Sequence, residues 1–270
     1  MDLGNPTLIQ EEGWTSCGEG DHKSPSSFPY SKPNKVYFST ILSTTKYGLF
    51  PFYYCMSTDH HTVELIHFTP KGDELVAYMA RVSNPDNQNN TKTSAKLISY
   101  LIKHKHWSPF EMVNMCVEIN TTRSIAAQIL RHRSFSLQEF SQRYADATQL
   151  GEPLTPELRW QDHTNRQNSI ESDEHNPFLE RQITDLYKHA QQVYGQLLEA
   201  GVAKECARDV LPLSTPTRMY MNGTLRSWIH YCQLRCANGT QKEHKVIAEQ
   251  VKQLIAMCYP AVYAAVWSTL

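Results

Sequence analysis

The stretch Arg131–Arg143 reads RHRSFSLQEFSQR and follows a short run of mostly apolar residues. It holds three arginines, one histidine, one glutamate and three serines within thirteen residues. This density of guanidinium groups adds little stability, because exposed ion pairs contribute only about 0–1 kcal/mol each and like charges repel. The natural complement is an anion with several oxygens, such as a phosphate or pyrophosphate, which the arginine fork can hold through paired hydrogen bonds.

The backbone conformation decides how this arginine-rich stretch can act. In a continuous helix its first three side chains would point about 100° apart and could not converge on one ligand. We therefore expect the helix predicted over Thr122–Arg131 to end here and the chain to continue in an extended form. Because extended residues two apart share a face, Glu139, Ser141 and Arg143 would then line one face over about 13 Å.

Patterns of strand and helix surround the arginine-rich stretch. Alternating apolar residues predict strands at Thr62–Phe68 and Met112–Asn120. Helical spacing predicts helices at Asp73–Val82, Thr91–Lys105, Thr122–Arg131, Phe178–Ala200, Lys204–Val210, Thr217–Cys236 (continuous or kinked near Gly223) and Thr240–Met257, the last being the final helix. These elements indicate an α+β fold in which an antiparallel sheet is flanked by helices, with long helices at the C-terminal end.

Two segments lack a regular period. Residues 1–55 are rich in Gly, Ser, Pro and aromatic residues, and we interpret them as an irregular N-terminal extension ahead of a catalytic domain over residues 56–270. A natural start at Met56 is compatible with this pattern. The polar segment Tyr144–Pro177 contains several prolines and is expected to be a long surface loop, with room for a short helix.

Bulk composition excludes several classes of protein. The net charge is -1 and the pI is about 6.9, without the basic surplus typical of nucleic-acid binders. The seven cysteines form no C-x-x-C pair, which favours reduced thiols in a cytoplasmic protein. No apolar run is long enough to predict a membrane span, and the N-terminus lacks the basic and apolar regions of a secretory signal.

The arginine-rich stretch resembles the signature R-H-R-x(2)-S-x(4)-S-x-R of flavin-dependent thymidylate synthases. Three further blocks agree with that family: HKHWSPFE at His104–Glu111, ECARDVLPL at Glu205–Leu213, and Leu225–Ser227 through Leu234–Arg235, followed by Gln241 and Glu243. The resemblance spans roughly Val63–Pro260 and does not include residues 1–55.

The resemblance implies a mixed α/β unit that assembles as a homotetramer, with each active site built from more than one subunit. It implies reductive methylation of deoxyuridine monophosphate (dUMP) to thymidine monophosphate (dTMP). Methylenetetrahydrofolate would supply the carbon, flavin adenine dinucleotide (FAD) would carry the hydride and NADPH would reduce the flavin. The cofactor then performs the difficult chemistry, while the protein supplies position and charge.

The resemblance also assigns roles to single residues. At the flavin it places Arg131, His132 and Arg133, together with His106, Ser108, Glu139, Thr224, Leu225, Arg226 and His230. At the nucleotide it places Gln128, Arg131, Glu139, Phe140, Ser141, Gln142, Arg143, Arg208 and Arg235. Arg235 would be the catalytic residue, because a guanidinium stays protonated and can stabilise negative charge that develops on the uracil ring. Gln138 and Thr224 depart from the family, which commonly has Asn at both positions.

Several of these residues have other interpretations. Ser141 could be a nucleophile, but that role needs a neighbouring base held by a third group, so we favour a binding hydroxyl. His104 and His106 could ligate a metal, but no third ligand stands at a convincing spacing, so no metal is predicted. His104 is more consistent with a structural role. Glu205 and Arg208 lie one helical turn apart and could simply pair with each other.

Arg226 and Arg235 stand nine residues apart, which is about 2.5 turns of helix. They would point to opposite sides of a regular helix. They could serve one site only across a kink or across a subunit interface, and the second option fits an oligomeric active site.

Two other classes of function match parts of the sequence. A nucleic-acid-binding module could use the arginines as a phosphate clamp, but the neutral net charge and the lack of a stacking pattern beside them oppose it. A metal-dependent nucleotide hydrolase could use His104 and His106 with acidic residues, but its ligand set is incomplete. A flavin-dependent methyltransferase acting on a pyrimidine nucleotide accounts for more of the chain.

Overall fold

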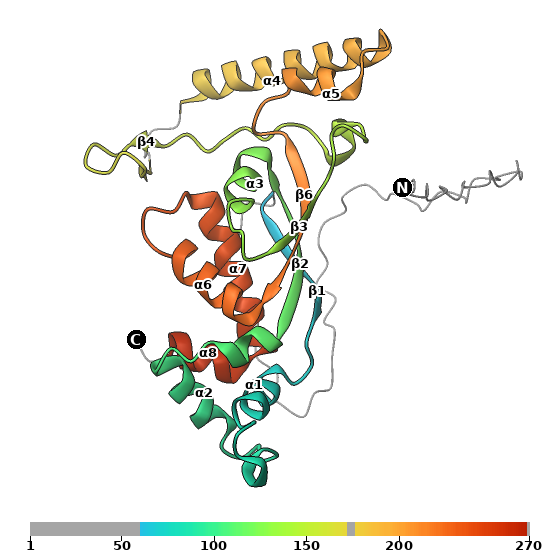
Figure 1. The fold of residues 1–270 in the computed structure, drawn as a ribbon. Helices are drawn as coiled ribbons and strands as arrows, with labels where there is room; N and C mark the ends of the chain where they lie inside the picture. Colours follow the sequence, from blue (N-terminus) through green and yellow to red (C-terminus); the bar gives the residue numbers. More distant parts are fainter. Residues whose placement is uncertain (1–59, 172–175, 269–270) are drawn as a thin grey trace, which may run out of the picture. The chain divides into compact units, whose positions relative to one another are not determined.

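The computed structural model describes residues 60–171 and 176–268. Its main sheet has four antiparallel strands in the order β1-β2-β6-β3. These are β1 (Thr62–Phe68), β2 (Asn114–Thr122), β6 (Pro216–Thr224) and β3 (Ser136–Glu139). The predicted α+β class with an antiparallel sheet is therefore confirmed, and the first predicted strand has the same bounds as β1 (Figure 1).

Helices surround this sheet. They are α1 (Gly72–Ala80), α2 (Ser94–Lys103), α3 (Arg123–Ile129), α4 (Pro177–Glu199), α5 (Lys204–Ala207), α6 (Leu225–Arg235), α7 (Lys242–Cys258) and α8 (Pro260–Trp267). Short 3-10 turns are η1 (Pro85–Asn87), η2 (Ser108–Met112), η3 (Ala147–Leu150) and η4 (Arg208–Val210). Helices α6 and α7 lie beside the sheet, whereas α4 and α5 lie together at one end (Figure 1).

The core lies between β2, β6 and the helices. Val117 and Ile119 of β2 and Met219 and Met221 of β6 are fully buried. Trp228 of α6 is also fully buried, and its indole N–H donates to the carbonyl of Met115 at 2.9 Å. A large buried aromatic ring with its one donor satisfied fixes α6 against the sheet, so the residues at both ends of α6 are held in place.

The predicted helix over Thr217–Cys236 is wrong in its first half. Residues 216–224 form β6, whose alternate residues are buried, and α6 begins only at Leu225. Strand β6 hydrogen-bonds to β2 on one side and to β3 on the other, so long-range pairing satisfies its backbone. Thr224 ends the strand and caps the helix by accepting a hydrogen bond from the amide of Ser227.

The C-terminal helices differ from the prediction in one respect. Helix α7 matches the predicted long helix over Thr240–Met257, but it is not the final helix. Tyr259 breaks it, and Pro260 starts α8, because proline suits the first turn of a helix but not its interior. Helix α8 packs on α2, so the C-terminal part of the described chain closes the core.

The polar segment over residues 144–177 is largely irregular as expected, but it contains more order than a plain loop. The short strands β4 (Trp160–Gln161) and β5 (Ser169–Ile170) form a hairpin in it. Arg159 pairs with Glu243 at the start of α7 at 2.8 Å, which ties the segment to the helical layer. The predicted extension over residues 1–55 and the alternative start at Met56 lie outside the described residues.

Among the described residues, no helix is both long enough and apolar enough to cross a membrane.

Candidate functional site

The start of the arginine-rich stretch runs along α6. Helix α3 ends at Ile129, close to the expected end at Arg131. The chain then passes the C-terminal end of α6, where Arg235 Nε donates to His132 Nε2 at 2.9 Å. Further along, Ser227 Oγ donates to the carbonyl of Ser134 at 3.3 Å. Two anchors on one helix therefore hold the segment that carries Arg131 and Arg133.

The guanidinium groups of Arg131 and Arg133 are available for a ligand. Both residues are exposed, and among the described residues neither side chain forms a hydrogen bond or an ion pair. His132 lies between them and is partly buried against the aromatic ring of Tyr231, at 5.0 Å between ring centroids. Unpaired guanidinium groups on an anchored segment match a pyrophosphate in charge and in hydrogen-bond donors.

His132 is neutral at physiological pH. Burial, together with the neighbouring Arg235, His230 and Arg131, lowers its pKa to about 4. A neutral ring can accept the hydrogen bond from Arg235 Nε, whereas a protonated ring could not. His132 therefore orients the guanidinium of Arg235 without reducing its charge.

A buried hydrogen-bond relay leads from α6 to Gln128. His244 of α7 is fully buried, and burial lowers its pKa to about 3, so its ring is neutral. Its Nδ1 lies 3.3 Å from Gln128 Oε1, which can only accept, and its Nε2 lies 3.1 Å from the hydroxyl of Tyr231. Nδ1 must therefore carry the proton, and the Tyr231 hydroxyl must donate to Nε2. Gln128 Nε2 in turn donates to Gln241 Oε1 at 2.6 Å.

This relay was not predicted from the sequence. Gln128 and Gln241 were singled out by resemblance, but Tyr231 and His244 were not. Tyr231 stands four residues before Arg235 and His244 three residues after Gln241. Those spacings suggest helical neighbours, but only the packing of α7 on α6 brings the two side chains together.

The expected shared face of Glu139, Ser141 and Arg143 is wrong. Strand β3 ends at Glu139, and the carbonyl of Ser141 accepts from the amides of Tyr144 at 3.1 Å and Ala145 at 2.9 Å, which is a turn. The carboxylate of Glu139 points back to the sheet, where it pairs with Arg123 at 2.5 Å. It also accepts from the hydroxyl of Thr217 at 2.9 Å. Glu139 is thus separated from Ser141 and Arg143 because the strand is shorter than the period suggested.

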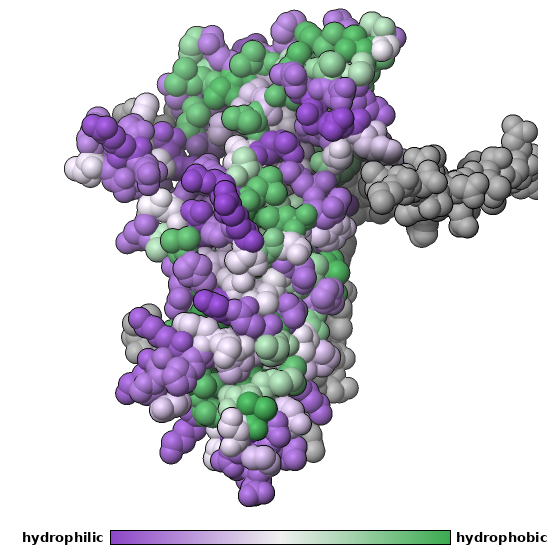
Figure 2. All heavy atoms as spheres, in the orientation of Figure 1, coloured by the Kyte–Doolittle hydropathy of each residue, from purple (hydrophilic) through white to green (hydrophobic). Residues whose placement is uncertain are grey.

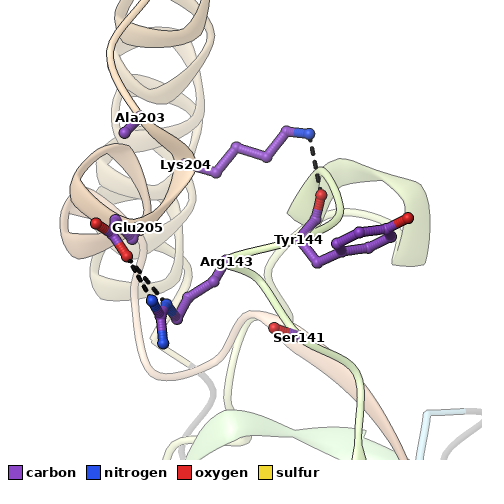
Figure 3. A pocket seen from close by; sticks show the side chains of 6 residues that line it. All are labelled: Ser141, Arg143, Tyr144, Ala203, Lys204 and Glu205. Carbon is purple, nitrogen blue, oxygen red and sulfur yellow. Dashed lines mark hydrogen bonds and ion pairs between the residues drawn. The ribbon is translucent and has the colours of Figure 1, made fainter. Parts of the chain in front are cut away.

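Ser141 and Arg143 line a pocket of about 320 Å³ with the start of α5 (Figure 3). Figure 3 shows Arg143 and Glu205 pointing toward each other, and their ion pair measures 2.9 Å. Lys204 donates to the carbonyl of Tyr144 at 3.0 Å and closes another side. Glu205 therefore pairs with Arg143, and the considered pairing of Glu205 with Arg208 is not present.

Other residues expected at the nucleotide lie near this turn. Gln142 is buried, and its Nε2 has no hydrogen-bond partner among the described residues. The backbone amide of Phe140 donates to the carbonyl of Arg218 at 2.9 Å, so the strand pairing continues for one residue beyond β3. Arg208 is half-buried in η4, with Asp209 4.0 Å away. A buried unpaired amide is costly, so Gln142 is a candidate donor for a ligand.

A separate group forms at the N-terminal end of α6. Glu111 of η2 accepts from the Thr224 hydroxyl at 3.2 Å and pairs with Arg226 at 2.5 Å. Ser108 opens η2 and is exposed. Leu225 is fully buried in the core. Glu111 belongs to the SPFE block of the sequence, but its part in this group was missed, because only the fold brings η2 to α6.

The remaining predicted residues lie at the edges of these groups. His230 is exposed on α6 and close enough to lower the pKa of His132. His104 ends α2, and its ring lies 6.2 Å from that of exposed His106. Neither histidine lies on a strand. Among the described residues, no three His, Cys, Asp or Glu side chains are grouped so as to hold a metal ion.

Comparison with known proteins shows which family the chain resembles. A family model described as "Thymidylate synthase complementing protein" matches residues 64–261. A probable flavin-dependent thymidylate synthase of Paramecium bursaria Chlorella virus 1 is 50% identical over 195 residues, covering 72% of this chain and 89% of the relative. A flavin-dependent thymidylate synthase of Synechocystis sp. is 48% identical over 199 residues, covering 73% of this chain and 89% of the relative.

A solved structure shares the fold. The UMP/dUMP methylase PolB from Streptomyces cacaoi, bound with 5-Br dUMP, aligns with a TM-score of 0.68 and 29% identity, covering 76% of this chain and 93% of PolB. The fold, the arginine-rich stretch and these matches define an enzyme of nucleotide methylation. The chain belongs to the flavin-dependent thymidylate synthase family, which confirms the resemblance seen in the sequence.

Proposed function

We propose that this protein converts dUMP to dTMP by reductive methylation, with methylenetetrahydrofolate as carbon donor, FAD as hydride carrier and NADPH as reductant. The names of the relatives and the dUMP analogue bound to PolB support dUMP as the substrate. The observation that carries the proposal is the arginine-rich stretch anchored beside Arg235. It supplies unpaired cations for phosphates next to a guanidinium for the pyrimidine ring.

The flavin would be held mainly through its phosphates. Arg131 and Arg133 are exposed and unpaired among the described residues, which fits two adjacent phosphate groups. Ser108 and Arg226 at the other end of α6 would contact it as well. When bound, FAD supplies the redox chemistry, and the residues of this chain position it and neutralise its charge.

The nucleotide would be bound by hydrogen bonds and by charge. Ser141 and Arg143 line the pocket of Figure 3, and the phosphate of dUMP would compete with Glu205 for Arg143. Among the described residues Gln142 Nε2 has no hydrogen-bond partner, which fits an acceptor atom of the ligand. Gln128 is held in one orientation by His244, which reduces the entropy lost when it binds a ligand.

Arg235 would be the catalytic residue. Its Nε is already bonded to neutral His132, so its terminal nitrogens remain to face the uracil ring. A guanidinium does not lose its proton at physiological pH, so it would stabilise negative charge on the uracil ring throughout the reaction. His132 acts here as an orienting group for Arg235.

We further propose a homotetramer with shared active sites. Arg226 and Arg235 stand at opposite ends of an unkinked α6, about 13 Å apart along its axis, so a kink cannot unite them. Around α4 and the segment beyond α5, Phe178 is 67% exposed, Leu186 62% and Leu213 72%. Figure 2 shows hydrophobic residues among hydrophilic ones at the α4 end of the molecule. Exposed apolar residues of this size favour contact with another subunit.

A cytoplasmic location is proposed on the state of the cysteines. Cys116, Cys206, Cys232, Cys236 and Cys258 are all free thiols in the described part of the chain. Free thiols are typical of a reducing compartment.

The decisive assay measures dTMP directly. Purified protein reconstituted with FAD is incubated with NADPH and methylenetetrahydrofolate, with and without dUMP, and dTMP is quantified by chromatography. We expect dTMP only in the complete mixture. UMP is tested in parallel, because PolB is described as a UMP/dUMP methylase. A protein that binds no flavin and forms no dTMP would contradict the proposal.

Arg235→Ala tests the catalytic assignment. We expect product formation to fall by at least about 100-fold, the scale of losing one electrostatic contact to the reacting group, while flavin absorbance is retained. Arg166→Ala is the matched control, because that arginine is exposed in the turn between β4 and β5, outside the α4 surface that we propose as a subunit contact. If Arg235→Ala loses flavin but binds dUMP normally, the residue serves the cofactor and our assignment is wrong.

A further inference from the structure

A second cavity, of about 350 Å³, lies away from the residues discussed so far. It is formed between α1 and the segment that leads into α2. Its lining combines apolar surface from Pro70, Leu75 and Tyr78 with polar and charged side chains, among them Lys71, Arg81 and Ser94. None of these residues belongs to the groups around α6 or to the pocket at Arg143. The cavity therefore needs an explanation of its own.

Arg81 is a buried cation that donates its hydrogen bonds to neutral groups. It is only 7% exposed, and its guanidinium donates to the carbonyl of Asn90 and, at 2.8 Å, to the hydroxyl of Thr93. Both acceptors are neutral. Among the described residues no Asp or Glu pairs with Arg81, although Glu74 also lines the cavity. A buried charge is costly unless an opposite charge accompanies it, so an anion in this cavity would lower the energy of the site.

Ser94 gives an independent indication of a ligand. It is 7% exposed and lines the cavity, and its Oγ has no hydrogen-bond partner among the described residues. It is the first residue of α2, a helix of ten residues. The side chain of Thr93 does not cap this helix, and its first turn holds no acidic residue. The amide of Ser94 donates to the carbonyl of Thr91 at 3.2 Å, so the N-terminus of α2 offers the cavity the Ser94 hydroxyl and the positive end of the helix dipole.

Lys71 adds a third cationic feature. It precedes α1 with φ at 53°, a left-handed conformation that is uncommon for lysine. Its ammonium group has no ion-pair partner among the described residues. Tyr78 of α1 also lines the cavity, and its ring is 40% exposed. A cavity of this size exceeds what a bare phosphate needs and leaves room for the molecule that carries it.

We propose that this cavity between α1 and α2 binds the phosphate group of a small phosphorylated compound, through Lys71, Arg81, Ser94 and the N-terminus of α2. Phosphate meets all these donors at once, since it offers several acceptor oxygens and a charge that Arg81 lacks locally. The site is separate from the proposed nucleotide and flavin contacts, so its occupancy does not depend on the proposed reaction.

The test uses the full-length protein loaded with FAD and dUMP, so that the arginine-rich stretch is already occupied. Inorganic phosphate is titrated at constant ionic strength, and binding is followed by 31P line broadening and by the thermal unfolding midpoint. We expect saturable binding to the wild type. Lys71→Ala should bind phosphate about tenfold more weakly, the scale of one charge-assisted hydrogen bond. Lys103→Ala, at the far end of α2, is the matched control and should bind like the wild type.

Ser94→Asp provides a second, opposite change. An aspartate in the first turn of α2 would place a carboxylate where we expect the phosphate, so this variant should unfold at a higher temperature without phosphate and lose the response to it. The proposal is overturned if the wild type shows no saturable binding, or if Lys71→Ala and Ser94→Asp respond like the wild type. Equal protection by acetate would show that the site does not select phosphate, and would also overturn it.

Discussion

At the scale of the residue, His132 and His244 make stability depend on pH. Burial lowers both pKa values, to about 4 and about 3, from an ordinary value near 6.5. Between the lowered pKa of each folded histidine and the ordinary value near 6.5, the unfolded chain binds protons that the folded chain does not. Their contribution to stability is therefore complete above about pH 6.5 and is lost as the pH falls toward 4.

We expect the free energy of unfolding, measured in urea, to decrease steadily from pH 7 to pH 4.5. His244→Asn, which keeps a donor toward Gln128 without a titrating ring, should lower stability at pH 7 and flatten this dependence. His189→Gln is the control, because His189 is exposed on α4. An unchanged slope in His244→Asn would show that other groups cause the acid sensitivity.

Glu139 and Glu205 both form ion pairs, but we expect only the pair of Glu139 to contribute much to stability. The side chain of Glu139 is 14% exposed and accepts from Arg123 and Thr217. Glu139→Gln should cost about 1–3 kcal/mol, because it leaves Arg123 without its charge-assisted partner. Glu205→Gln breaks the exposed pair with Arg143 and should cost less than about 1 kcal/mol. Urea midpoints give both values, and equal losses would contradict this ranking.

At the scale of the element, the approach of β6 to the arginine-rich stretch requires a glycine. A Cβ at Gly223 would overlap the ring of Phe135, which packs on Trp228 with 4.6 Å between ring centroids. Phe135 cannot move away freely, because it also faces Tyr231 at 6.0 Å. Since Phe135 is two residues from Arg133, displacing it would also move the proposed flavin contacts.

Gly223→Ala should therefore lower stability by about 1–3 kcal/mol, the usual cost of overpacking, and weaken FAD binding measured by fluorescence. Gly195→Ala is the matched control. A Cβ at Gly195 meets nothing within 4 Å, and the residue lies inside α4, so alanine should add about 0.5–1 kcal/mol through helix propensity. Similar effects of the two substitutions would mean that Phe135 relaxes without strain.

The elements show where sequence patterns succeed. Helix α4 was predicted nearly in full, because a long amphipathic period followed by Gly201 is a local signal. Strand β6 was assigned to a helix, although its buried residues alternate. The prediction extended the helix of α6 backwards over these residues. The hydrogen bonds that make them a strand come from β2 and β3, which are distant in the chain.

At the scale of the whole molecule, the proposed shared active sites make a test by complementation possible. Arg226→Ala and Arg235→Ala would each be inactive alone. If one site takes these two arginines from different subunits, randomly mixed tetramers should recover up to about a quarter of the activity, since about one site in four would be intact.

The mixture is made by co-expression, and dTMP formation per subunit is measured. Mixing Arg235→Ala with the double variant Arg226→Ala/Arg235→Ala is the control and should recover no activity. If the first mixture also stays inactive, the two arginines act within one subunit or one of them is not needed. A native mass of a single chain would contradict the tetramer directly.

The candidate site could be predicted in part. The motif spacing was enough to select Arg131, His132, Arg133 and Arg235, and the Arg235–His132 contact supports treating them together. The relay through Tyr231 and His244 could not be predicted, because it depends on how α7 packs on α6. The shared face of Glu139 and Ser141 was wrong, because the turn at Ser141 replaces the strand.

The sequence by itself determined the family, the α+β class and most helices, because spaced motifs and amphipathic periods are local properties of the chain. Only the tertiary structure decided that residues 216–224 form one of the two inner strands of the sheet, that Glu139 pairs with Arg123, and that Arg143 pairs with Glu205. It also decided that Arg81 is buried and pairs with no Asp or Glu among the described residues. Pairing, burial and charge compensation depend on residues far apart in the chain, so the pattern of neighbouring residues does not contain them.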